Sequence, residues 1–235
     1  KIKAAYIAAG YNEAQLIDFS YNGGTVSETG EWIPNPYGCT DTDRPSAQNL
    51  APLETMLRDY RAKHPQAHFT LIGHSLGGYL AFLEAERESR RSEGDRLGID
   101  TVITLAAPLK GVSADKKIAL DVAVPCDKTY AAAAEIVADK ERPDIAALRA
   151  GQVEAMRAAG IRLATLGNNG DCLYNLPRCT QGIFSIIDDS PTQYIENADL
   201  VKRYEIQSAS VFLSHFAIFV YPQALIDLIA FAGAP

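Results

Sequence analysis

The sequence predicts an α/β protein with a mostly parallel central sheet and helices on both of its faces. Short apolar runs with strand character alternate along the chain with helical patterns, as they do where helices cross over a parallel sheet. The 235 residues fit one large domain better than two independent cores. Hydrophobic residues make up 47% of the chain and charged residues 22%, ordinary values for a protein that buries a core.

Residues 1–90 are expected to hold three helices and two strands. They are a helix over residues 2–9, a strand over 15–21 (QLIDFSY), a helix over 46–63, a strand over 69–72 and a helix over 76–90. Residues 23–45 are polar and rich in Gly, Pro and Thr, which predicts a long surface loop. Loops of this length usually carry function or disorder.

A further strand precedes a helical insertion, and the sheet resumes after it. Strands are expected over residues 100–108, 161–167 and, with a weaker pattern, 201–207, followed by a last helix over 221–231. Between about 110 and 160 the strand rhythm stops, and two Ala-rich helical segments flank Pro143. This insertion is either a lid over the site or a helical layer that completes the core.

Charge and hydropathy exclude several classes of partner. The formal net charge is −7 and no run of Lys and Arg occurs, which disfavours nucleic acids and anionic membrane surfaces. The longest apolar stretch, residues 211–232, is interrupted by polar residues, so it predicts buried strand-loop-helix structure rather than a membrane span.

The four cysteines are Cys39, Cys126, Cys172 and Cys179. None forms a Cys-x-x-Cys pair, so neither a zinc site nor thioredoxin-type chemistry has support, and we expect no metal. Cys172 and Cys179 share one loop-like segment. They form either a local disulfide, which would indicate an oxidising compartment, or two free thiols. The pattern of the opening residues does not predict a signal peptide.

The stretch Gly73-His-Ser-Leu-Gly-Gly78 lies between a predicted strand and a predicted helix. A serine that points out of such a bend needs a strained backbone, and its neighbours two residues away must be small because strand and helix approach closely there. This context predicts that Ser75 is a nucleophile. The alternatives are an idle serine in a Gly-rich turn, and a phosphate-binding loop, whose Lys-Ser/Thr ending is absent.

A serine nucleophile needs a base, usually histidine, and the chain has four histidines. His64 and His68 precede the serine and are expected at the surface. His74 lies within the bend and is expected to point away from the attack site. His215, after the last strand, is therefore the predicted base, although a buried structural histidine is the alternative.

The carboxylate that orients the base should lie between the serine and the histidine in the chain. Asp171 directly follows a strand, in a turn rich in Gly and Asn, and catalytic groups collect at the carboxyl ends of parallel strands. Its rivals Asp188, Asp189 and Asp199 do not directly follow an apolar run, so they are expected to be solvated loop residues.

The motifs GHSLGG, ITLAAPLKG and TLGNNGD occur in this order along the chain. Together they resemble the α/β-hydrolase superfamily, in particular its bacterial lipases and esterases. The resemblance implies one α/β-hydrolase domain over residues 1–235 with a helical lid or cap. It also implies a Ser75–His215–Asp171 triad and an acyl-enzyme mechanism without a metal or organic cofactor.

The oxyanion hole departs from this resemblance. In such lipases a strand that ends in a His-Gly turn precedes the first helix and supplies one amide, whereas this chain opens in what looks like that helix. We expect this first strand to lie upstream of residue 1. The Leu76 backbone N–H is the first expected oxyanion donor, and the Tyr21 hydroxyl is a stand-in for the second.

The predicted function is hydrolysis of carboxylic esters, with a small ester or lipid as substrate and transient contact with a lipid interface. The apolar residues of the insertion suit either a greasy acyl chain or plain core; they are Ile136, Val137, Ile145 and Leu148. The alternatives are an amidase, thioesterase or deacylase acting on a lipid-linked substrate, and a non-catalytic binding module, which the complete triad disfavours. The lipase resemblance and the Cys172–Cys179 alternative favour secretion; oligomeric state is left open.

Overall fold

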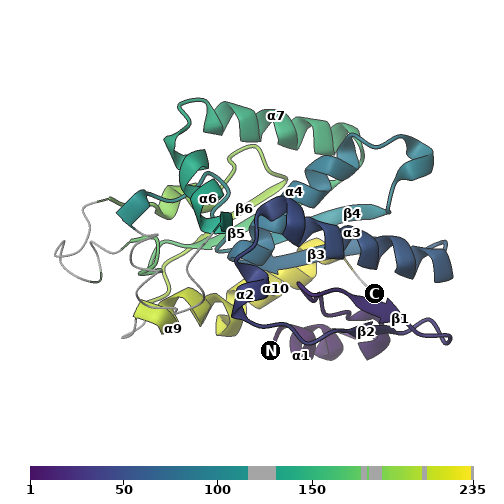
Figure 1. Cartoon of the computed structure of the whole chain (residues 1–235). Coiled ribbons are helices and arrows are strands. Elements are labelled where there is room, and N and C mark those ends of the chain that lie inside the picture. The colour runs from purple at the N-terminus through teal and green to yellow at the C-terminus, as the bar shows by residue number, and fades with distance from the viewer. Residues whose placement is uncertain (116–130, 176–178, 180–186, 208–210, 234–235) are drawn as a thin grey trace.

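The computed structural model describes residues 1–115, 131–175, 179, 187–207 and 211–233. Its centre is a parallel sheet in the order β3 (Phe69–His74), β4 (Ile99–Leu105), β5 (Arg162–Asn168) and β6 (Leu200–Tyr204) (Figure 1). The register of β3 on β4 runs from Phe69 opposite Ile99 to His74 opposite Leu105. The predicted parallel sheet is confirmed.

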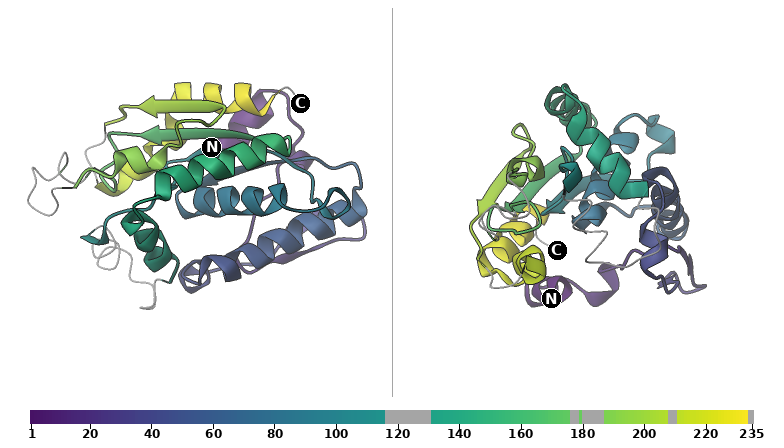
Figure 2. Two further views of the ribbon diagram at one scale, coloured as in Figure 1. Left: turned by 90° about the horizontal axis from the view of Figure 1, so that it is seen from above. Right: turned by 60° about the vertical axis from the view of Figure 1, so that its left-hand side comes forward.

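Helices cover both faces of this sheet (Figures 1 and 2). On one face lie α3 (Ser46–Lys63), α4 (Leu76–Ser89) and α7 (Ile145–Ala158), and on the other lie α1 (Ile2–Ala8) and α10 (Pro222–Ala232). The buried side chains form a main cluster on each face, with Phe82 and Met156 in one and Tyr6 and Leu228 in the other. Burial of apolar surface on both faces is what stabilises a parallel sheet.

Other elements lie between these helices and strands. They are α2 (Cys39–Thr42), α6 (Ala131–Glu141), α9 (Val211–Phe216), the strands β1 (Gly24–Val26) and β2 (Trp32–Pro34), and the 3-10 helices η1 (Glu13–Gln15), η2 (Glu93–Asp95), η3 (Ser190–Gln193) and η4 (Ala217–Val220). The antiparallel pair of β1 and β2, together with α2, lies within the segment predicted as a long loop.

The predicted strand over residues 15–21 is wrong, because residues 16–20 have no regular structure. A strand needs a hydrogen-bonded neighbour, and this segment has none among the described residues. Its nearest candidate is β3, whose outer edge is unpaired within the described part of the chain. A cavity of about 440 Å³ lies between the two, lined by Leu16, Ile17 and Phe19 on one side and by Leu71 and Ile72 on the other.

The helical insertion has two parts that pack differently. Helix α7 crosses from β4 to β5 and packs against α4 and β5, with Val153 and Met156 in the main cluster on that face. Helix α6 places Ile136 beside Tyr79 and Tyr174. Ile136 and Ile145 are buried, which favours the core interpretation of these two residues. Residues 116–130 of the insertion lie outside the described residues, and the lid stays a prediction.

The C-terminal apolar stretch is helical from α9 through η4 to α10, so the predicted strand-loop-helix order is wrong. Among the described residues, no single helix combines the length and the apolar character that a membrane crossing requires. One bent pair, Leu213–Val220 with Pro222–Ala232, passes that test by length and composition alone, with 58° between its helices.

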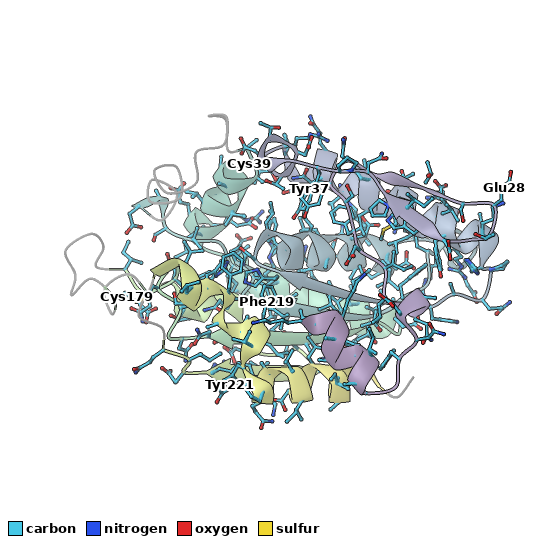
Figure 3. The ribbon with its side chains drawn as sticks, turned by 90° about the horizontal axis from the view of Figure 1, so that it is seen from below. Glu28, Tyr37, Cys39, Cys179, Phe219 and Tyr221 are labelled. Carbon is cyan, nitrogen blue, oxygen red and sulfur yellow. A yellow bond between two sulfur atoms is a disulfide. The ribbon has the colours of Figure 1, made fainter. Side chains whose placement is uncertain are left out.

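The structure joins Cys172 to Cys179 in a disulfide, with their Cα atoms 5.6 Å apart. Of the two sequence alternatives for this pair, the local disulfide is therefore the one present. Cys39 is disulfide-bonded as well. Figure 3 labels Cys39 and Cys179. Cys126 lies outside the described residues.

Candidate active site

Ser75 occupies the bend between β3 and α4 with φ 53° and ψ −125°, a positive φ that non-glycine residues rarely adopt. The surrounding structure holds this conformation on both sides of the serine. The Ser75 N–H donates to the Leu105 carbonyl at 2.9 Å, and the Ser75 carbonyl accepts from the N–H groups of Gly78 and Tyr79 at 3.0 and 3.1 Å. The strain is thus balanced by hydrogen bonds to β4 and within α4.

Two glycines of the bend are required by the close approach of β3 to α4. A Cβ on Gly78 would lie 2.7 Å from the Ala107 Cβ and 2.7 Å from the Gly73 carbonyl oxygen. A Cβ on Gly73 would meet the backbone of Gly77. Because real Cβ atoms do not come this near to other backbone atoms, the small residues predicted around the serine are a steric necessity.

His215 and Asp171 form a close pair on two different elements. His215 lies in α9, and Asp171 lies three residues after the end of β5. The His215 Nδ1 and the Asp171 Oδ2 are 2.6 Å apart, and the carboxylate is fully buried. The other carboxylate oxygen accepts from the Leu173 N–H at 2.9 Å. The structure therefore brings together the base and the acid that chain order predicted.

The pairing fixes which nitrogen of His215 is available. An ionised carboxylate can only accept, so the proton of the neutral ring lies on Nδ1 and the lone pair on Nε2. Among the described residues the buried Nε2 has no hydrogen-bond partner. A buried, unpaired acceptor is costly in a structural histidine, but a general base needs its acceptor nitrogen free.

His74 lies directly against His215, so the expectation that it points away from the site is wrong. The two imidazole centroids are 4.4 Å apart, and the His74 Nε2–H donates to the His215 carbonyl at 3.0 Å. Burial and then the nearby charge of His215 lower the pKa of His74 to about 3, so His74 is neutral at ordinary pH. Since His74 adjoins Ser75 in the chain, this contact brings His215, the predicted base, near the bend. Ser75 Oγ and His215 Nε2 themselves are not hydrogen-bonded to each other.

The two expected oxyanion donors lie at the amino end of α4. Leu76 is the first residue of that helix, so its N–H has no acceptor within the helix. A Cβ on Gly77 would lie 3.8 Å from the Tyr21 hydroxyl oxygen, which places that hydroxyl beside the first turn. Burial, and less strongly Tyr37, raises the pKa of Tyr21 to about 12, so the hydroxyl keeps its proton and can donate.

The rival histidines make contacts elsewhere. The His64 Nε2 lies 2.9 Å from the Gly30 carbonyl oxygen. His68 is exposed and lies 2.7 Å from Asp100 through its Nδ1. Neither contact reaches the bend at Ser75, which agrees with their exclusion as bases.

The rival carboxylates are also engaged elsewhere. Asp188 is exposed and accepts from the Ser190 N–H at 2.8 Å. Asp199 accepts from the Leu163 N–H at 2.8 Å and pairs with Arg157. Asp189, however, is fully buried and pairs with Lys140 at 3.0 Å, so its expected solvation is wrong. It also accepts from the Ser113 N–H at 2.8 Å, which gives it a structural role.

Apolar side chains are exposed on the segment that carries His215. Leu213, Phe216 and Val220 are 64%, 52% and 49% exposed. They line a groove of about 560 Å³ together with Phe219 and Tyr221, which Figure 3 labels along the yellow segment. The Phe216 ring centroid lies 5.6 Å from that of His215, so the apolar surface adjoins the predicted base.

Sequence reasoning missed Tyr174, a buried residue of the site. The Tyr174 hydroxyl donates to the Ala106 carbonyl at 2.6 Å, and its ring centroid lies 5.9 Å from that of His215. Its position three residues after Asp171 is the one signal that the sequence offered. In the described part of the chain, no group of three or more His, Cys, Asp or Glu side chains is arranged to hold a metal ion.

Comparison with known proteins identifies the architecture around this site. A family model described as the alpha/beta hydrolase fold matches residues 32–125, which include the bend at Ser75. The chain has the α/β-hydrolase fold. The product of the gene lin2722 from Listeria innocua has a similar structure over 98% of this chain and 89% of its own, with a TM-score of 0.52 and 11% identity. No significant match was found among curated proteins.

Two other solved structures resemble this α/β-hydrolase fold more weakly. The lipase BlEst2 of Bacillus licheniformis, in its mature form, matches with a TM-score of 0.44 and 16% identity, over 77% of this chain and 75% of its own. A structure from a study of carboxylesterases of Nitrososphaera gargenis matches with a TM-score of 0.35 and 13% identity, over 76% and 69%.

Proposed function

We propose that the chain is a serine hydrolase that cleaves carboxylic esters, with Ser75 as nucleophile, His215 as general base and Asp171 as the carboxylate that orients the base. The observation that carries the proposal is the hydrogen bonding of His215. Its Nδ1 lies 2.6 Å from Asp171, and its buried Nε2 has no partner among the described residues. Its ring packs against His74, which adjoins the strained residue Ser75 in the chain.

Acylation follows from these positions. The His215 Nε2 takes the proton of the Ser75 hydroxyl as Oγ attacks the ester carbonyl carbon and forms a tetrahedral intermediate. Asp171 stabilises the imidazolium and keeps its Nδ1 proton in place. The imidazolium then gives its proton to the alkoxy oxygen, the bond from the carbonyl carbon to that oxygen breaks, and the alcohol leaves an acyl group on Ser75.

Deacylation repeats these steps with water as the nucleophile. His215 takes a proton from the water, the hydroxide attacks the acyl carbon, and the proton returns to Ser75 as the acid leaves. In both steps the negative carbonyl oxygen needs donors, and we assign this role to the Leu76 N–H and the Tyr21 hydroxyl. Loss of one such donor costs roughly 10²–10³-fold in kcat.

The exposed groove beside His215 supports a lipophilic ester as substrate. Leu213, Phe216 and Val220 offer an acyl chain apolar surface that water otherwise covers. Each buried methylene contributes about 0.8 kcal/mol, so a chain of several carbons would bind this groove with useful affinity. We therefore favour esters with acyl chains of medium or greater length.

Hydrolysis of p-nitrophenyl esters from acetate to palmitate tests the proposal. The wild type should turn over, and Ser75→Ala should lose at least about 10⁴-fold in kcat. The matched control is Ser89→Ala, because the Ser89 hydroxyl donates to the Glu86 carbonyl at the far end of α4. This variant should keep wild-type activity. Equal hydrolysis by Ser75→Ala would contradict the proposal. If the wild type turns over matched amides or thioesters but no esters, its substrates are amides or thioesters rather than esters.

A further inference from the structure

Asn168, the last residue of β5, is 1% exposed, and its side-chain amide is bonded on both sides. The Oδ1 accepts from the Gly170 N–H at 3.0 Å and from the Ile206 N–H at 2.8 Å. The Nδ2 donates to the Ile206 carbonyl at 3.1 Å and to the Ser214 carbonyl at 3.4 Å. One side chain thus connects three backbone segments.

These segments include those that carry the acid and the base. Asn168 lies three residues before Asp171, and Ser214 directly precedes His215. A second bond joins the same segments on the other side of Asp171, since the Cys172 N–H donates to the Ser214 Oγ at 2.9 Å. Hydrogen bonds to Ser214 therefore come from both sides of Asp171 in the chain, from Asn168 and from Cys172.

The physical consequence is a rigid joint between β5 and α9. Leaving a buried amide or backbone group without its hydrogen-bond partner costs about 1–3 kcal/mol of folding free energy. The hydrogen-bonded geometry is therefore strongly preferred to any displaced one. Catalysis by oriented groups is sensitive to displacement, and an error of about 1 Å costs on the order of 10²-fold in rate. The bond between Asp171 and His215 fixes one distance only, whereas these neighbouring bonds also fix the direction in which the ring points.

We propose that Asn168 and Ser214 are positioning residues, which hold the segments of Asp171 and His215 in register so that the His215 Nε2 points at the nucleophile. This assignment rests on the proposed function. It predicts that loss of either side chain lowers kcat and leaves substrate binding almost unchanged, because neither residue lines the groove beside His215.

The test compares Asn168→Ala and Ser214→Ala with a matched control, Asn169→Ala. Asn169 is the next residue, and its side chain makes two bonds as well, donating to Glu205 at 3.0 Å and accepting from the Tyr194 hydroxyl at 2.8 Å. Those bonds do not reach α9. We expect about 10–100-fold lower kcat for the first two variants, with KM within about threefold of wild type, and no comparable loss for the control.

A spectroscopic readout separates positioning from general stability. The proton between the His215 Nδ1 and Asp171 should give a far-downfield proton resonance in the wild type and in Asn169→Ala. In Asn168→Ala and Ser214→Ala it should shift or broaden at a temperature where circular dichroism shows both to be folded. If Asn168→Ala does not fold, Ser214→Ala, which keeps the Asn168 amide, decides the question.

Two results would overturn the assignment: kcat values of both variants equal to that of Asn169→Ala, or an unchanged downfield resonance in a folded variant. The failure of the proposed function is a separate outcome. If Ser75→Ala hydrolyses esters as fast as the wild type, the triad is wrong, whereas the resonance, which needs no turnover, still reports whether Asn168 and Ser214 hold the pair.

Discussion

The rings of His74 and His215 pack at an angle of 45° with their centroids 4.4 Å apart, and the His74 Nε2–H donates to the His215 backbone carbonyl at 3.0 Å. His74, which adjoins the proposed nucleophile in the chain, thereby contacts both the ring and the backbone of the proposed base. Two protonated imidazoles at this distance would repel each other, so only one of the pair can readily carry charge. The low pKa of His74, about 3, keeps this imidazole neutral beside the proposed base.

This pair predicts how stability depends on pH. His74 has a pKa near 6.5 when unfolded and about 3 when folded, so its neutral form is favoured by folding. Its contribution is full above pH 6.5 and is lost as the pH falls from 6.5 towards 3, at about 1.4 kcal/mol per pH unit. The variant His74→Gln keeps a donor and does not titrate. Urea unfolding at pH 7.5, 6, 5 and 4 should therefore show a steeper loss of free energy for the wild type, and parallel curves would refute this account.

The carboxylate of Asp171 is predicted to set the tautomer of His215. In Asp171→Asn the amide no longer favours the proton on Nδ1, so the free nitrogen points away from the serine. We expect kcat for ester hydrolysis to fall about 10⁴-fold with little change in the thermal unfolding midpoint. Asp188→Asn, a change at an exposed rival carboxylate, should stay within about twofold of wild type. If only Asp188→Asn lost activity strongly, the assignment of Asp171 as the acid would be wrong.

The bend at the serine is predicted to tolerate no side chain at Gly78. In Gly78→Ala the new methyl would lie 2.7 Å from the Ala107 Cβ and from the Gly73 carbonyl, so we expect a loss of about 1–3 kcal/mol in the free energy of unfolding. Gly151→Ala is the matched control, because nothing lies within 4 Å of the Cβ it adds to the exposed face of α7. That change should stabilise the protein by about 0.5–1 kcal/mol. Denaturant unfolding of both variants checks the opposite signs.

The apolar groove beside His215 is predicted to select long acyl chains. Phe216→Ser and Leu213→Ser remove exposed apolar surface, so stability should hardly change, while kcat/KM for long-chain esters should fall about tenfold relative to acetate. Ile226→Ser, at a similarly exposed residue on α10 outside the groove, should leave the ratio unchanged. An unaltered ratio in the first two variants would show that the acyl chain binds elsewhere.

Features set by neighbouring residues were predictable from the sequence. The spacing of apolar residues and a proline beyond its end predicted α3 over residues 46–63, the bounds that the structure has. The strained turn at Ser75 was predictable for the same reason, because the small residues that permit it lie within two or three positions of the serine. Asp171 and His215 lie far apart in the chain, yet their places after β5 and β6 sufficed to pair them.

Other features that depend on distant partners were not predictable. Residues 15–21 have the composition of a strand, but a strand also needs a neighbour, and their composition does not reveal whether one is present. The direction of His74 depends on where α9 lies, and the burial of Asp189 depends on Lys140 and Ser113. Local sequence carries no record of such contacts.

The most direct test of the central claim is the site and rate of labelling by a fluorophosphonate, mapped by peptide mass spectrometry. The proposed triad predicts one adduct per chain, on Ser75, and labelling at least about 100-fold slower in His215→Ala. An adduct on another residue, no adduct on the folded wild type, or equal rates in wild type and His215→Ala would contradict the assignment of Ser75 as a nucleophile activated by His215.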